Sequence, residues 1–122
     1  MNHNRDFTRI LHILKYTRKL HSLALKIDSV DVFKENEDNV DLVSFWIFQI
    51  SENIANLSDD YKLCYPEIEW RILHRFRTIA AHKYESLDID SLWSIWRNRI
   101  PKLHEFVQQQ IDKVRSLRGD ED

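Results

Sequence analysis

Three side chains with complementary chemistry lie close together in the sequence. Arg77 is followed five positions later by His82, and Tyr84 comes two positions after the histidine. Histidine has a pKa near neutrality and suits general acid–base catalysis, while the arginine guanidinium holds phosphate oxygens with a rigid fork of donors. Together these groups could transfer a proton and stabilise negative charge on a phosphate.

The spacing is informative only when all three residues are required. With 10 arginines and 6 histidines in 122 residues, an arginine with a histidine five positions later is expected about 0.5 times by chance. A second such pair, Arg99 and His104, is indeed present, and Phe106 stands where the tyrosine would be. Requiring one of the 4 tyrosines lowers the expectation to about 0.02.

A helix over 66–82 is predicted to carry the arginine and the histidine. Pro66 suits its first turn, and acidic residues follow the proline where they favour the helix dipole. Residues five apart on an ideal helix point about 140° from each other. Arg77 and His82 therefore share one site only if the helix ends before His82, if the arginine reaches round, or if a second subunit completes the site.

A polar face of the same helix extends the possible site. Arg71, Arg75, Thr78 and His82 follow one another at steps of four, three and four, which places them on one side of a helix. If Arg77 and His82 form a site, Arg71, Arg75 and Lys83 could widen it into a track for phosphates, with Thr78 as a supporting hydrogen-bonding group. The simpler alternative for each residue is a solvated helix surface, with His82 at the helix C-terminus and Arg77 in an exposed salt bridge.

The rest of the chain also has the patterning of helices. Apolar residues at helical spacing predict helices over 6–26 and 39–57, separated by an acidic loop over 28–38. A turn over 88–91 precedes a last helical run over 92–117, which Pro101 should kink or divide. We predict an all-α, antiparallel bundle of four to five helices, forming one domain over 1–122 with a frayed tail over 118–122.

Composition excludes several classes of protein. The chain has 1 glycine, so it has no glycine-rich phosphate loop and few hairpin turns. Its 1 cysteine, Cys64, allows no internal disulfide and no cysteine zinc site, and we expect it to be a small buried hydrophobe. The polar N-terminus resembles no signal peptide, and no apolar run has membrane-spanning length. We expect a cytoplasmic protein with no cofactor and no metal, and we expect the 4 tryptophans to anchor the core or an interface.

Charge is distributed unevenly along the chain, although its net value is only -2. Residues 1–26 contain six lysines and arginines and a single acid, Asp6, whereas residues 27–60 contain nine acids and only Lys34. Residues 71–83 contain four cations and no acid. Separate basic segments are compatible with binding of an anion such as RNA, and equally with solvated faces that pair across the fold.

The motif and its surroundings resemble the HepT-like toxins of the HEPN superfamily, which share the order arginine, four residues, histidine, any residue, tyrosine. The resemblance covers most of the chain, and the matching segments are Asp6, Ile50-Ser51-Glu52, Pro66-Glu67-Ile68-Glu69-Trp70, Arg77, His82-Lys83-Tyr84, Asp88, Leu92-Trp93 and Ile100-Pro101-Lys102-Leu103. Three positions depart from the family pattern. Thr78 stands where asparagine or aspartate is common, and Ser51 and Lys83 each replace a common glycine.

The resemblance implies a HEPN-like fold and a toxin–antitoxin pair from a bacterium or archaeon. Family members are metal-independent ribonucleases that act as homodimers, which assigns catalysis to Arg77 and His82. Their partner is a minimal nucleotidyltransferase antitoxin of the MntA type, and it adds AMP to the motif tyrosine, here Tyr84. Two alternatives remain at this stage: a non-catalytic helical module that binds a nucleotidyltransferase and its substrate, and a helical interaction domain that uses Trp93 and Trp96.

Overall fold

The computed structural model describes residues 3–82 and 86–119, and within these residues the chain forms seven helices and no strand. The all-α prediction is thus confirmed. The helices are α1 (His3–Ala24), α2 (Val30–Glu35), α3 (Glu37–Ala55), α4 (Asp59–Cys64), α5 (Trp70–Ala81), α6 (Ser86–Asn98) and α7 (Ile100–Arg118).

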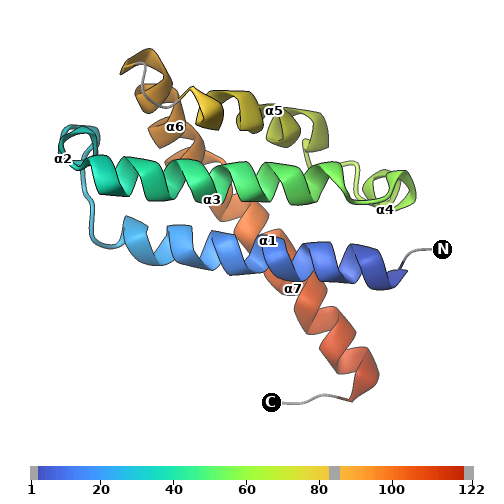
Figure 1. Cartoon of the computed structure of the whole chain (residues 1–122). Helices are drawn as coiled ribbons and strands as arrows, with labels where there is room; N and C mark the ends of the chain where they lie inside the picture. The colour runs from blue at the N-terminus through green and yellow to red at the C-terminus, as the bar shows by residue number, and fades with distance from the viewer. Residues whose placement is uncertain (1–2, 83–85, 120–122) are drawn as a thin grey trace.

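The three helices α1, α3 and α5 lie side by side, with α3 in the middle (Figure 1). Successive members of this layer run in opposite directions, as the antiparallel prediction requires. The α6 and α7 helices cross the layer, and α7 packs against α1. The short helices α2 and α4 lie at the two ends of α3. Since α3 packs against neighbours on both sides, it is the central element of the fold.

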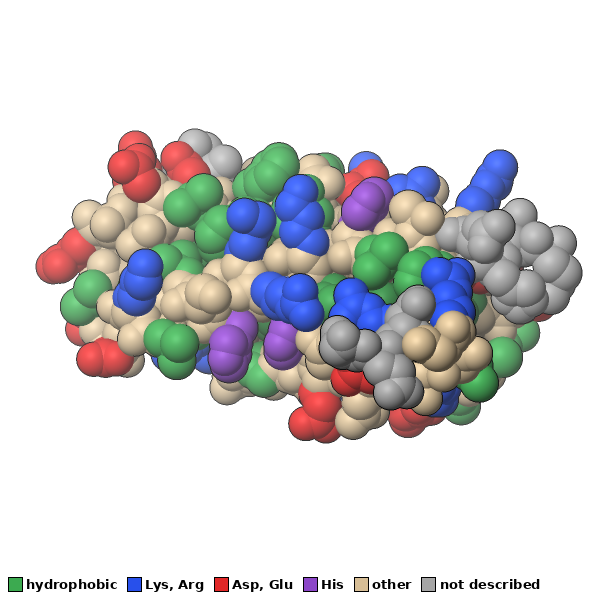
Figure 2. Space-filling model, turned by 90° about the horizontal axis from the view of Figure 1, so that it is seen from below, with side chains coloured by type: hydrophobic (Ala, Val, Ile, Leu, Met, Phe, Trp, Pro, Cys, Tyr) green, Lys and Arg blue, Asp and Glu red, His purple; other side chains and the backbone are tan. Residues whose placement is uncertain are grey.

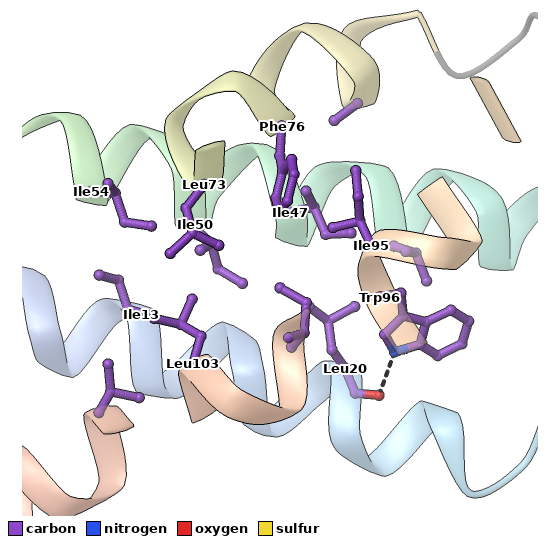
Figure 3. Packing of buried hydrophobic residues seen from close by; sticks show 14 of the residues in the cluster. Ile13, Leu20, Ile47, Ile50, Ile54, Leu73, Phe76, Ile95, Trp96 and Leu103 are labelled. Carbon is purple, nitrogen blue, oxygen red and sulfur yellow. Dashed lines mark hydrogen bonds between the residues drawn. The ribbon is translucent and has the colours of Figure 1, made fainter. Parts of the chain in front are cut away.

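A continuous apolar core joins the layer to the crossing helices (Figure 3). Ile13, Ile47 and Ile54 have no exposed surface, and each such side chain contributes about 1.5–3 kcal/mol through burial. Trp96 is 2% exposed, and its indole Nε1 donates to the Leu20 carbonyl at 2.9 Å (Figure 3). The bond satisfies the one polar group of this side chain, and Trp96 is a core anchor as expected.

The short helices were missed, because six residues contain too little periodicity to show a pattern. The segment expected to be a loop over 28–38 contains α2, whose Phe33 is fully buried and whose first turn is capped by Ser29. Ser58 caps α4 in the same way, through a bond from the Tyr61 amide. Cys64 ends α4 and is exposed, so its prediction as a buried residue is wrong.

Two predicted boundaries are also wrong, and one is confirmed. The helix expected to start at Pro66 starts at Trp70, whose indole donates to the Tyr65 carbonyl at 3.0 Å and holds the preceding turn against the helix. The turn expected over 88–91 lies inside α6, which begins at Ser86. Pro101 divides the last helical run as predicted, since it lies in the first turn of α7, where no amide donor is needed.

A buried carboxylate ties the start of α1 to the start of α4. Asp6 is 6% exposed, and its oxygens accept from the Ser58 amide at 2.8 Å and from the Ser58 hydroxyl at 2.7 Å. The Ser58 hydroxyl accepts in turn from the Tyr61 amide at 3.1 Å. This chain of bonds satisfies a buried charge and orders the helix cap at once.

Replacing this carboxylate should destabilise the protein clearly. We expect Asp6→Ala to lower the free energy of unfolding by about 2–3 kcal/mol, because hydrogen bonds to a charged group are lost in a buried position. Urea unfolding followed by circular dichroism measures the change. Asp31→Ala, an exposed acid in the first turn of α2, is the matched control and should cost less than about 1 kcal/mol. If both variants lost the same free energy of unfolding, the buried bonds of Asp6 would not be the cause.

Two histidines stack where α1 meets α7. The rings of His21 and His104 are 5.6 Å apart and nearly parallel, and His104 Nδ1 lies 2.8 Å from the Thr17 hydroxyl oxygen. Because that hydroxyl donates its proton to the Leu14 carbonyl at 3.1 Å, neutral His104 donates from Nδ1. Burial lowers the pKa of His104 below its usual value, and His21 and Arg18 lower it further.

The lowered pKa makes stability depend on pH. As pH falls below about 6.5, His104 takes up a proton in the unfolded chain before it does so in the folded one, so the free energy of unfolding decreases. For one group the slope is at most about 1.4 kcal/mol per pH unit. Unfolding in urea between pH 7.5 and 5.5 should show a steeper loss for the unchanged protein than for His104→Gln. If the free energy of unfolding fell equally with pH in both proteins, His104 would not be the group responsible.

Candidate functional site

The helix that carries the predicted motif packs closely on α3. The apolar side of α5 is buried there through Leu73, Phe76 and Ala80. Ser51 of α3 is 1% exposed, and its hydroxyl donates to the Leu73 carbonyl at 3.0 Å. A small residue at this position leaves room for the α5 backbone, which accounts for serine where glycine was expected from the resemblance. The contact sets the distance of α5 from α3.

Arg77 lies on the flank of α5 that faces α3. Its Nε is 3.0 Å from the Glu52 carboxylate, and the centre of its guanidinium is 5.8 Å from the Phe48 ring. The arginine side chain is about half exposed (51%). These contacts hold the guanidinium by one edge and one face, while the two terminal nitrogens have no acceptor among the described residues. The paired nitrogens of a held guanidinium suit a phosphate.

His82 lies at the end of the same helix. The α5 helix ends at Ala81, and His82 is its C-cap, exposed to solvent, with its amide donating to the Ile79 carbonyl. Of the three arrangements considered, the structure shows a helix that ends before His82. The ending comes only one residue earlier, so the directions of the two side chains still differ, and no contact joins Arg77 to His82 within the described part of the chain.

The polar face predicted on α5 is present. Arg71, Arg75, Thr78 and His82 are all exposed, and none of the four forms an ion pair with a described acidic residue. At 100° per residue they lie within an arc of about 60°, whereas Arg77 lies well outside this arc. A single copy therefore presents the arginine of the motif on one flank of α5 and the histidine with the other cations. Lys83 and Tyr84 lie outside the described residues.

Two residues beside Arg77 were not predicted as part of the site. Glu52 and Phe48 come from α3 and contact the guanidinium from a helix distant in sequence. The resemblance did include Glu52 within Ile50-Ser51-Glu52, and this was the available signal. The Glu52 oxygen that faces Arg77 is buried, so the ion pair is shielded on the acidic side and open on the basic side.

The described residues contain no group of three or more histidine, cysteine, aspartate or glutamate side chains placed to hold a metal ion. Among the helices described, none combines the length and the apolar character needed to cross a membrane.

Comparison with known proteins identifies a family for this chain. A family profile described as "Ribonuclease HepT-like" matches residues 13–110, which include α3, α5 and the motif. No solved structure matches the chain significantly.

Curated relatives carry related names. A "Probable ribonuclease HepT" of Thermococcus cleftensis is 37% identical over 54 residues, covering 44% of this chain and 49% of the relative. A putative RNase of Methanocaldococcus jannaschii is 26% identical over 65 residues, covering 53% and 54%. A third relative, named gamma-glutamylcyclotransferase and putative RNase, is 31% identical over 67 residues, covering 52% of this chain and 30% of the relative. The chain spans about half the length of the first curated relatives that it matches.

Proposed function

Since the chain belongs to the HepT-like ribonuclease family, we propose that it is the toxin of a toxin–antitoxin pair and cleaves RNA without a metal ion. The proposal rests mainly on the contacts of the Arg77 guanidinium. Glu52 and Phe48 hold its guanidinium, and its terminal nitrogens are left for a phosphate, on the helix that ends at His82.

In the proposed reaction His82 acts as the base. Its imidazole takes the proton of the 2′-hydroxyl, the 2′-oxygen attacks the adjacent phosphorus, and the bond to the 5′-oxygen breaks. The products are a 2′,3′-cyclic phosphate and a 5′-hydroxyl, which needs one proton from a general acid. Arg77 stabilises the negative charge on the phosphate oxygens in the transition state. Thr78, exposed on the turn beside Arg77, supports the site by hydrogen bonding.

A homodimer completes this site in our proposal. One copy places Arg77 and His82 in different directions, so a two-fold arrangement that brings two α5 helices together would pair the arginine of one copy with the histidine of the other. The second histidine then supplies the proton for the 5′-oxygen. The exposed cations Arg71 and Arg75, with Lys83, would hold the phosphates on either side of the cleaved bond.

Regulation is proposed to act at Tyr84 through an MntA-type nucleotidyltransferase antitoxin. AMP attached two residues after His82 would place a bulky anion next to the catalytic groups. It would block RNA and reduce the positive potential that attracts it.

The activity is tested by RNA cleavage in EDTA, with mixed tRNA as substrate and with protein shown by intact mass to be unmodified. We expect cleavage by the unchanged protein and a rate at least about 100-fold lower for Arg77→Ala and for His82→Ala, because charge stabilisation or the base is lost. Arg99→Ala is the matched control, since Arg99 belongs to the chance pair with His104 and should keep the rate. Circular dichroism and gel filtration show that each variant is folded.

Other results of this assay have defined meanings. If the unchanged, folded protein does not cleave, the non-catalytic module that binds a nucleotidyltransferase is favoured. If His82→Ala cleaves as fast as the unchanged protein, the catalytic assignment is wrong.

Modification is tested by coexpression with the nucleotidyltransferase. We expect the unchanged protein to gain the mass of AMP and to stop inhibiting growth, whereas Tyr84→Phe gains no mass and remains toxic, because it lacks the acceptor oxygen. Tyr65→Phe keeps a tyrosine at position 84 and serves as the control, which should be silenced normally. Silencing of Tyr84→Phe would show that the antitoxin acts elsewhere.

A further inference from the structure

A second basic region lies on α1, away from the motif. Arg5, Lys15, Arg18 and Lys19 are exposed, and at 100° per residue they lie within an arc of about 140° on the outward side of this helix. The single acid of α1, Asp6, is buried on the opposite side and bonded to Ser58. We call the four cations the α1 surface. Figure 2 shows Lys and Arg side chains spread along the underside of the molecule, with most acidic groups toward its margin.

None of the described acidic residues neutralises the charges of the α1 surface through an ion pair. Some exposed cations elsewhere have acidic partners, as in the ion pairs of Lys34 with Asp90 and of Arg77 with Glu52. Within the described residues, no member of the α1 surface forms an ion pair, and Arg18 donates to the neutral Gln108 at 3.2 Å. Four cations without a described acidic partner, spread along about 21 Å of helix, are suited to attract a polyanion.

Aromatic rings border the α1 surface on the side of α3. Lys15 Nζ is 5.3 Å from the centre of the Tyr16 ring, and Lys19 Nζ is 5.8 Å from the Trp46 ring. The Phe45 ring meets Tyr16 edge-on at 6.3 Å and is 53% exposed. An exposed ring next to cations is the combination by which proteins bind single-stranded nucleic acid, the cations holding phosphates and the ring stacking on a base.

Phe45 lies near a further ring of α3, Phe48, which contacts the arginine of the motif. Phe45 and Phe48 are three positions apart on α3, and therefore occupy neighbouring places on its surface. The Arg77 guanidinium lies over the Phe48 ring, with its central carbon 5.8 Å from the ring centre. Since α3 lies between α1 and α5 (Figure 1), these rings connect the α1 surface with the proposed catalytic arginine.

We propose that the α1 surface and Phe45 bind single-stranded RNA on its way to the motif. The proposal rests on the proposed ribonuclease function and adds a substrate class and a site to it. Lys15, Lys19 and their neighbours hold the phosphates, and an unpaired base stacks on Phe45 before the strand crosses α3. A duplex would satisfy the cations and leave Phe45 unused, because its bases are already stacked and paired.

The test is fluorescence anisotropy with a labelled 20-nucleotide oligouridine, measured from 0.05 to 0.5 M salt in full-length His82→Ala protein so that cleavage does not interfere. In that background we expect Lys15→Gln/Lys19→Gln to reduce the slope of log Kd against log salt by about 1.4, since each phosphate contact to a single strand contributes about 0.7. The same relation predicts about 25-fold weaker binding at 0.1 M salt.

Matched controls separate a site from general charge. Lys62→Gln/Lys102→Gln removes the same charge from positions on α4 and α7 that have no ion-pair partner among the described residues, and it should change Kd less than about 3-fold. Phe45→Ala should weaken oligouridine at least about 5-fold while leaving a 20-base-pair RNA duplex unchanged, since stacking contributes about 1–3 kcal/mol per base. Leu63→Ala, which removes another exposed apolar side chain, should change neither the affinity for oligouridine nor the affinity for the duplex.

Three results would overturn the proposal: an unchanged slope in Lys15→Gln/Lys19→Gln, equal losses in the two lysine pairs, or a Phe45→Ala protein that changes its oligomeric state in gel filtration but not its RNA affinity. The last result would assign Phe45 to a contact between copies. The cleavage assay tests the proposed function separately. If the α1 surface binds RNA but the unchanged protein does not cleave it, the ribonuclease activity is contradicted and the binding site is not.

Discussion

The fold depends on burial of α3 on two sides at once. Its apolar residues face α1, α5 and the crossing helices, and Ile47 and Ile54 retain no exposed surface. A helix packed in this way keeps only a narrow strip toward solvent, between its contacts with α1 and its contacts with α5. Glu52 and Phe45 belong to this strip, so the same packing that stabilises the protein places an acid beside the motif and an exposed ring beside α1.

Close packing of α5 on α3 has a direct chemical consequence. Ser51 bonds to the α5 backbone at Leu73, and one turn further along Arg77 reaches Glu52. The ion pair is partly exposed and therefore contributes little to stability, about 0–1 kcal/mol. Its effect is on position, because a guanidinium held at Nε loses freedom before any phosphate arrives. The arrangement is suited to binding an anion without a large reorganisation.

Several parts of the fold followed from the pattern of residue types. Periodic apolar residues predicted α1 and α3 to within a few residues, and Pro101 predicted the break between α6 and α7, because both signals act locally in the backbone. The α2 helix and the start of α5 did not follow. Their ends depend on Phe33 filling the core and on the Trp70 indole bonding to the Tyr65 carbonyl. Cys64 was misplaced because residue type alone says nothing of whether a neighbouring helix covers it.

For the site, the sequence by itself determined which groups are available: a motif of Arg77, His82 and Tyr84, a polar face on α5, and an excess of cations in the first 26 residues. Helix geometry also predicted that the arginine and the histidine would point about 140° apart on an unbroken helix, but where the helix ends was left open. Only the tertiary structure decided the partners. Glu52, Phe48 and Phe45 reach their places because α3 packs between α1 and α5, and contacts between helices distant in sequence depend on how the whole core fills space rather than on any local spacing.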